Sequence, residues 1–235
     1  MEIVGPEPPT SDRIRGRHER LLARLRAVAA ANGHDPDGLR IVAITKAWPA
    51  EVARAAFEAG IGRLGESRVQ EAEPKVAAVP EAEWHFVGRL QANKARRAVR
   101  AFAVIHSVDS LALLRRLRER AAEEGATPSL LLQVNVSGEA AKAGLPPADA
   151  LAAELVAAVR EGGVIGLMTI APMGAGTDEA RRVFGGLREL RDRLQDAAGI
   201  PLPELSMGMT ADAEAAAAEG ATLVRIGTAL FGPRT

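Results

Sequence analysis

The sequence IVAITKAWPAE at residues 41–51 separates the two kinds of α/β fold that this chain could adopt. It opens with an apolar, β-rich run that ends at Lys46, and a helical pattern starts near Pro49. A doubly wound open sheet usually carries a glycine-rich phosphate-binding turn after its first strand. Because that position reads TKAWPAE here, the stretch favours a closed barrel.

Seven further β-rich runs continue the pattern, at 63–67, 84–88, 104–109, 130–136, 164–170, 204–209 and 223–227. The strand runs are apolar without alternation, and helical patterns separate them, which is typical of a parallel (β/α)8 TIM barrel. An extra N-terminal helix is expected from Ser11 to near Gly33. Several of the later helical patterns end at a glycine, the residue that helix termini with positive φ prefer. These glycines are Gly60, Gly125, Gly162, Gly199 and Gly220.

No linker or internal repeat divides the chain, so we expect a flexible tail at residues 1–10 and a single barrel domain at residues 11–235. Lys+Arg and Asp+Glu both total 30, so no strong field favours a nucleic-acid or membrane partner. The absence of cysteine excludes disulfides, thiolate metal sites and a cysteine nucleophile. The N-terminus lacks a secretory pattern, and no apolar run is long enough to span a bilayer, so a cytoplasmic location is expected.

Polar residues gather at the carboxyl ends of the expected strands, where TIM barrels build their active sites. Lys46 ends the first strand, Ser67 the second and Asn135 the fifth. Burial in a barrel mouth would favour the neutral amine of a lysine, which can attack a carbonyl to form a Schiff base. The alternative is a lysine that ends the strand and extends its ammonium group into solvent.

Two segments at the ends of the last two strands, 206–210 (SMGMT) and 227–228 (GT), combine glycine with hydroxyl residues. The loops after strands 7 and 8 of a TIM barrel, together with helix N-termini, form a recurrent phosphate site. Thr210 and Thr228 could equally be ordinary helix N-caps. Arg225 points to the same side as Gly227. It needs an anion or acceptor if it faces inward, and it would pair with a helix if it faces outward.

Eight collinear segments between about residue 12 and residue 232 carry a resemblance to a known family. They read IVAITK (41–46), GESRVQE (65–71), WHFVGRLQANK (84–94), IHSVDS (105–110), LLQVNVSGEAAKAGL (131–145), GLMTIAP (166–172), LSMGMTAD (205–212) and VRIGTALFG (224–232). Together they resemble the YggS/PROSC family of pyridoxal phosphate homeostasis proteins.

The resemblance implies a fold-type III barrel that binds pyridoxal 5′-phosphate, similar to the N-terminal domain of alanine racemase. Lys46 matches the lysine that forms the Schiff base, and Arg225 matches the arginine that faces the pyridine nitrogen. The other cofactor-binding residues that it implies are Ser67, Asn135, Met168, Ser206, Met207, Gly208, Thr210, Gly227 and Thr228.

The chain departs from the family pattern at two places. Ser67 stands where the family has asparagine, so a contact with the ring would have to pass through water. Arg89 stands where histidine is common, and we therefore leave it out of the expected site.

An arginine at the pyridine nitrogen keeps that nitrogen unprotonated, which makes the ring a weak electron sink. Racemases of this fold type compensate with a second base, a tyrosine from a further domain. This chain has no tyrosine and ends soon after the eighth strand. The resemblance thus implies a monomeric, non-catalytic carrier in intracellular cofactor homeostasis, with pyridoxal phosphate-dependent apoenzymes as recipients. The alternatives are a racemase-like enzyme and an aldolase-like barrel that binds a sugar phosphate directly.

Overall fold

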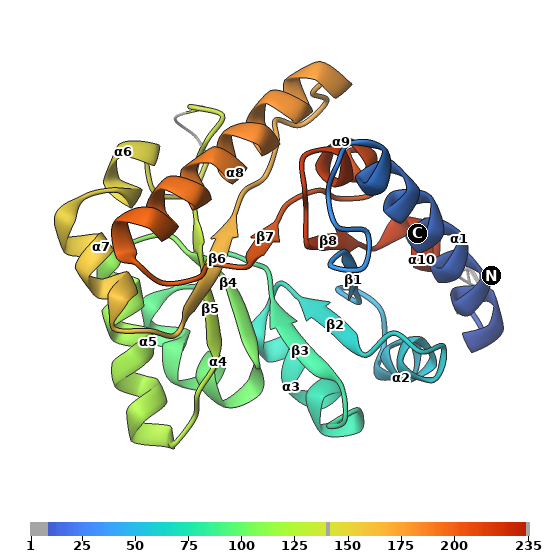
Figure 1. Ribbon diagram of the computed structural model, residues 1–235. Helices are drawn as coiled ribbons and strands as arrows, with labels where there is room; N and C mark the ends of the chain where they lie inside the picture. The colour runs from blue at the N-terminus through green and yellow to red at the C-terminus, as the bar shows by residue number, and fades with distance from the viewer. Residues whose placement is uncertain (1–8, 140–141, 234–235) are drawn as a thin grey trace.

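The computed structural model describes residues 9–139 and 142–233, and its eight strands close into a barrel. The strands follow one another around the barrel in sequence order, and all neighbouring pairs are parallel. Figure 1 shows the strands at the centre, with helices around them. The predicted parallel (β/α)8 barrel is confirmed. Residues 1–8 of the expected tail, and residues 140–141 and 234–235, lie outside the described residues.

The strands are short, and each ends one to three residues before its predicted end. They are β1 (Arg40–Ile44), β2 (Arg63–Glu66), β3 (Glu83–Phe86), β4 (Val104–Val108), β5 (Ser129–Gln133), β6 (Val164–Met168), β7 (Glu204–Ser206) and β8 (Leu223–Ile226). Their last predicted residues lie beyond the strand ends and lead into the loops of the barrel mouth, although several still donate a backbone hydrogen bond to the neighbouring strand, as Thr45 does to Gly65. The prediction that Lys46 is the final residue of the first strand is therefore wrong, because it lies in the turn after β1.

The helices form the outer layer and connect successive strands. They are α1 (Ser11–Ala31), α2 (Ala50–Glu58), α3 (Val69–Ala78), η1 (Ala92–Lys94), α4 (Ala95–Ala101), α5 (Leu111–Glu124), α6 (Pro147–Ala150), α7 (Ala153–Arg160), α8 (Thr177–Ala198), α9 (Ala213–Ala218) and α10 (Thr228–Phe231). The extra N-terminal helix is confirmed as α1, which packs against α2, α9 and α10. Among the described residues, no helix combines the length and the hydropathy that a bilayer crossing requires.

The main apolar core lies between the barrel and its helices, and a smaller cluster fills part of the barrel interior. The interior cluster contains Val42, Ile44, Val104, Leu131, Met168 and Leu223. Polar side chains take up other interior positions. Arg40 of β1 donates two hydrogen bonds, at 2.8 and 2.7 Å, to the carboxylate of Glu204 on β7. The barrel interior thus holds an ion pair at its amino end as well as apolar side chains.

Candidate functional site

Lys46 lies half-buried at the barrel mouth, in the turn between β1 and α2. The next residue, Ala47, has a φ of 63°, in the left-handed region. A residue with a β-carbon adopts this conformation at a cost of about 1–2 kcal/mol, so the surrounding structure must hold it. Pro49 then serves as the N-cap residue of α2. The chain turns sharply after Lys46, and the amine stays at the mouth.

A buried polar cluster fixes this turn from the helix side of the barrel. Thr45 donates its hydroxyl to Glu66 Oε1 at 2.6 Å. Lys75, on α3, donates from Nζ to the carbonyl of Thr45 at 2.8 Å and to Glu66 Oε1 at 2.6 Å. All three side chains are buried. Sequence patterns do not reveal this cluster, because Thr45, Glu66 and Lys75 lie in three separate segments of the chain.

The chain has four lysines, and their environments differ. Lys75 is buried and ion-paired with Glu66. Lys142 contacts Ser137 and Glu139 within its own loop, and Lys94 ends η1 on the outer layer. Lys46 is therefore the lysine that directly follows an interior-facing strand and lies at the barrel mouth.

Arg225 faces the barrel interior and not the helices. It pairs in register with Val42, a member of the interior cluster, and only 5% of it is exposed. Its guanidinium donates to Ser206 Oγ at 2.6 Å and to the carbonyl of Thr169 at 2.9 Å. These bonds use two of the five N–H donors of the group, so donors remain for a ring nitrogen. Burial lowers the pKa of Arg225 to about 10, which leaves it charged at neutral pH.

The loops after β7 and β8 lie beside Arg225. Gly208 has a φ of 89°, and its carbonyl accepts a hydrogen bond from the Arg225 backbone at 3.0 Å. Met207 is fully buried, whereas Thr210 and Thr228 are exposed. The Ser206 hydroxyl points into the barrel, where it contacts Arg225 and His106. The serine is thus placed beneath the expected phosphate site and bound to other partners.

The alternative assignment of the two threonines as N-caps is wrong. The N-cap of α9 is Asp212, whose side chain accepts from the Met209 backbone and does not cap the helix, and that of α10 is Gly227, which has no side chain. The first N–H groups of a helix have no partner within the helix, so an uncapped end can accept an anion. This donor set fits the phosphate group of the expected cofactor.

The remaining predicted residues lie at or below the same rim. Met168 belongs to the interior cluster. Asn135 is half-buried, and its amide donates to the Glu139 carbonyl at 2.8 Å while its oxygen accepts from Ser137 at 3.0 Å. Asn135 also lines a cavity of about 180 Å³, together with Arg89 and Thr169 among others. Its amide group is thus engaged in shaping the loop after β5.

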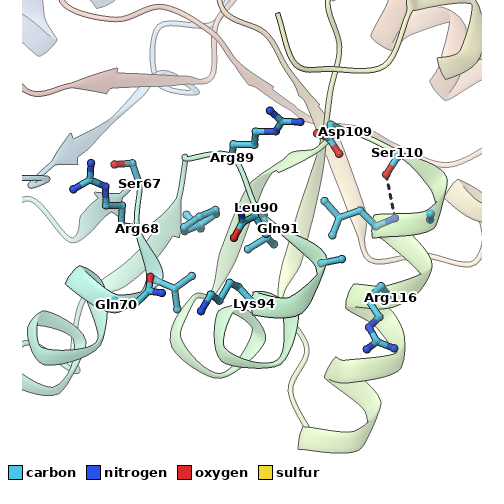
Figure 2. Close-up of a pocket in the computed structure, with 15 residues that line it drawn as sticks. Ser67, Arg68, Gln70, Arg89, Leu90, Gln91, Lys94, Asp109, Ser110 and Arg116 are labelled. Carbon is cyan, nitrogen blue, oxygen red and sulfur yellow. Dashed lines mark hydrogen bonds between the residues drawn. The ribbon is translucent and has the colours of Figure 1, made fainter.

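Ser67 borders a larger cavity, of about 790 Å³, beside the mouth at the ends of β2, β3 and β4. Figure 2 shows Ser67 and Arg68 on one side of it, Asp109 and Ser110 on the other, and Arg89 between them. Four of its lining side chains are basic and one is acidic: Arg68, Arg89, Lys94 and Arg116, and Asp109. Arg89, which is not among the expected site residues, lines both cavities.

Comparisons with known proteins show the family to which this barrel belongs. The family model for the N-terminal domain of alanine racemase matches residues 19–235. The pyridoxal phosphate homeostasis protein of Aquifex aeolicus is 39% identical over 221 residues, which are 93% of this chain and 97% of that protein. The corresponding protein of Pseudomonas aeruginosa is 42% identical over 218 residues, with 92% and 93% covered.

Solved structures give the same result. The structure of PipY of Synechococcus elongatus with pyridoxal phosphate bound has a TM-score of 0.80 and 43% identity, and the match covers 93% of this chain and all of that one. An alanine racemase of Clostridium difficile shares only the fold, with 13% identity, a TM-score of 0.67, and 89% and 58% coverage. This chain belongs to the family of pyridoxal phosphate homeostasis proteins, built on the barrel of the alanine racemase N-terminal domain.

Proposed function

We propose that this chain binds pyridoxal 5′-phosphate as a Schiff base of Lys46 and buffers or delivers the cofactor inside the cell, without strong turnover of its own. The proposal rests on the buried guanidinium of Arg225, which Ser206 and Thr169 hold at the barrel mouth. The N–H groups that these two bonds do not use remain available to a ligand. The relative PipY, whose structure was solved with pyridoxal phosphate bound, supports the choice of ligand.

Each part of the site has one task in this proposal. Lys46 supplies the amine, and the uncapped starts of α9 and α10 bind the phosphate. Arg225 would donate to the ring nitrogen of a bound cofactor. When bound, the cofactor supplies an aldehyde and a ring that withdraws electrons strongly only when its nitrogen is protonated. Because Arg225 keeps its own proton near neutral pH, it favours holding the cofactor over chemistry with it.

The residues available for a second base also favour a carrier over a racemase. A racemase of this fold needs a second base opposite the lysine, and the chain contains no tyrosine for that role. We further propose that the protein acts as a monomer in the cytoplasm and passes the cofactor to pyridoxal phosphate-dependent apoenzymes. The alternative is a racemase-like enzyme that uses another base.

Trapping of the Schiff base tests the proposal. The purified protein is loaded with pyridoxal phosphate and reduced with borohydride, and peptide mapping by mass spectrometry locates the adduct. We expect the adduct on Lys46 and a loss of the Schiff-base absorbance in Lys46→Ala. Lys94→Ala is the matched control and should keep both. An adduct on another lysine, or an unchanged spectrum in Lys46→Ala, would refute the assignment.

Incubation with D- and L-alanine, followed by chiral analysis, separates a carrier from an enzyme. A carrier should interconvert the two forms no faster than free pyridoxal phosphate does. Racemisation that is fast in the parent protein and lost in Lys46→Ala would replace the carrier function with the racemase alternative.

A further inference from the structure

Beneath Arg225, four side chains form a continuous line of hydrogen bonds through the barrel interior. Ser206 Oγ lies 2.8 Å from His106 Nδ1, and His106 Nε2 lies 2.8 Å from His85 Nδ1. His85 Nε2 lies 2.8 Å from Glu83 Oε1. Both histidines and the serine are at most 1% exposed, whereas the side chain of Glu83 is 44% exposed at the amino end of the barrel. The line therefore connects solvent below the barrel with the guanidinium at its mouth.

The chemistry of the two ends fixes the direction of every bond in this line. A guanidinium can only donate, and an ionised carboxylate can only accept. Glu83 must therefore receive a proton from His85 Nε2, which makes Nδ1 of a neutral His85 an acceptor. His106 must then donate from Nε2 and accept at Nδ1, from the Ser206 hydroxyl. With both imidazoles neutral, this is the single assignment that satisfies all the bonds.

We propose that Glu83, His85, His106 and Ser206 form a one-directional hydrogen-bond chain that positions the Arg225 guanidinium. They are positioning residues, since they act on a ligand only through Arg225. Their effect on a bound cofactor rests on the proposed function, whereas the direction of the chain does not. The two histidines have no other role in the site, and this arrangement accounts for their burial among polar partners.

The charges around the chain favour its neutral form. Burial lowers the pKa of His106 well below 6.5, and the neighbouring His85 and Arg225 lower it further. Burial also lowers the pKa of His85, against the opposing effect of Glu83. The hydrogen bond from His85 lowers the pKa of Glu83, which keeps the carboxylate ionised. The other charged groups near the lower end are Arg63, which pairs with Glu83, and the pair of Arg40 and Glu204.

A proton added to either histidine would reverse part of the chain. Whichever of the two histidines gains the proton, His106 then carries a hydrogen on Nδ1. It therefore donates to Ser206 and no longer accepts from it. The Ser206 hydroxyl hydrogen then loses its acceptor, and a second positive charge lies near Arg225. The geometry of the Arg225 guanidinium would therefore depend on the protonation of His85 and His106. His85 contacts the partly exposed carboxylate of Glu83.

Nitrogen NMR of the cofactor-free protein with ¹⁵N-labelled histidine tests the direction of the chain. Tautomers are distinguished by their ring nitrogen shifts and long-range couplings. We expect His85 and His106 to carry hydrogen on Nε2 at pH 7.5, assigned with His85→Gln and His106→Asn. Hydrogen on Nδ1 of either ring, or a charged ring at this pH, would overturn the proposal.

Absorbance spectra of the cofactor-loaded variants test the effect on Arg225. His106→Leu removes the acceptor for Ser206, so we expect a shifted absorbance band and a several-fold faster loss of cofactor on dialysis. In His106→Asn the amide oxygen can still accept from Ser206, so this variant should stay close to the parent. His34→Gln, outside the chain, is the control. A band and a release rate in His106→Leu equal to those of the parent would contradict the positioning role.

The two sets of results separate the two proposals. If borohydride traps no cofactor on Lys46 but both tautomers are as expected, the proposed function fails and the hydrogen-bond chain stands. If trapping succeeds and a tautomer is wrong, the chain fails and the proposed function stands. The NMR measurement uses the parent protein with His85→Gln and His106→Asn for assignment and does not use His106→Leu, so poor folding of His106→Leu does not prevent a decision.

Discussion

At the scale of single residues, the orientation of Arg225 decides the chemistry of the site. Strand alternation alone allowed this side chain to face either the barrel interior or the helices. The register of β8 against β1 places it opposite Val42, inside the barrel. There it meets two acceptors, and its charge is retained at neutral pH.

Arg225→Glu reverses the sign of the group that we expect at the ring nitrogen. A carboxylate would favour a protonated ring, which is a stronger electron sink. We expect an altered absorbance spectrum of the bound cofactor and new side reactions with amino acids, such as slow transamination, detected by product analysis. A spectrum and a reactivity that match the parent protein would show that Arg225 does not face the nitrogen.

The buried pair of Lys75 and Glu66 gives a second prediction at this scale. Lys75→Met leaves the Glu66 carboxylate buried with Thr45 as its remaining partner, and loss of one partner of a buried pair typically costs about 3–5 kcal/mol. The double variant Glu66→Gln/Lys75→Met should recover most of that loss, as measured by urea unfolding. Arg116→Met, which breaks an exposed pair with Glu119, should cost less than about 1 kcal/mol. Similar losses in the single and the double variant would contradict this account.

At the scale of elements, the helix ends follow the sequence closely, whereas the strand ends do not. The five glycines expected at helix C-termini all have positive φ, with Gly125 at 62° and Gly199 at 67° as the C-cap residues of α5 and α8. This local preference depends on the missing β-carbon alone. A strand, in contrast, ends where its neighbours on both sides diverge, and the sequence of the strand does not contain that information.

Gly208, in the loop between β7 and α9, is constrained both by close packing and by a positive φ. A β-carbon there would lie 2.5 Å from the Ala216 β-carbon, and its φ is 89°. Overpacking of this kind typically costs about 1–3 kcal/mol, and the positive φ adds strain. We expect Gly208→Ala to lower the free energy of unfolding by about 1–3 kcal/mol or more. We also expect it to weaken cofactor binding.

Gly62→Ala provides the control for this loop, because a β-carbon at Gly62 meets open space. Changes at such surface positions usually stay within about 0.5 kcal/mol. Urea unfolding of the two variants under the same conditions measures the difference. Equal stabilities would show that the loop after β7 can relax around the added methyl group.

At the scale of the whole molecule, the polar interior of the barrel makes its stability depend on pH. The pKa values of His85 and His106 are lowered in the folded protein, mainly by burial. As the pH falls below about 6.5, the unfolded chain binds protons that the folded chain does not. Stability is therefore complete above this pH and is lost on acidification towards the lowered pKa values.

The expected loss is up to about 1.4 kcal/mol per pH unit for each histidine. Urea unfolding between pH 7.5 and pH 5.5 measures it. His106→Asn should reduce the slope, even if it lowers stability at all pH values. Burial also lowers the pKa of the half-buried His18. Its contribution to the slope is the same in both proteins and cancels in the comparison. The same slope in the parent and the variant would mean that His106 titrates as it does in the unfolded chain.

The fold and the family were within reach of the sequence, because both depend on patterns that each segment carries locally. Apolar runs, helical periodicity and terminal glycines predicted the eight strands and α1, and eight collinear segments carried the resemblance to the family. The contacts around the site could not be predicted from the sequence. Thr45, Glu66 and Lys75 come from three segments, and the line from Glu83 to Arg225 joins β3, β4, β7 and β8. Pairing of neighbouring strands brings Thr45 and Glu66 together, whereas only closure of the barrel brings His106 of β4 within hydrogen-bond distance of Ser206 of β7. These contacts depend on register and on the face of each strand, which no single segment determines.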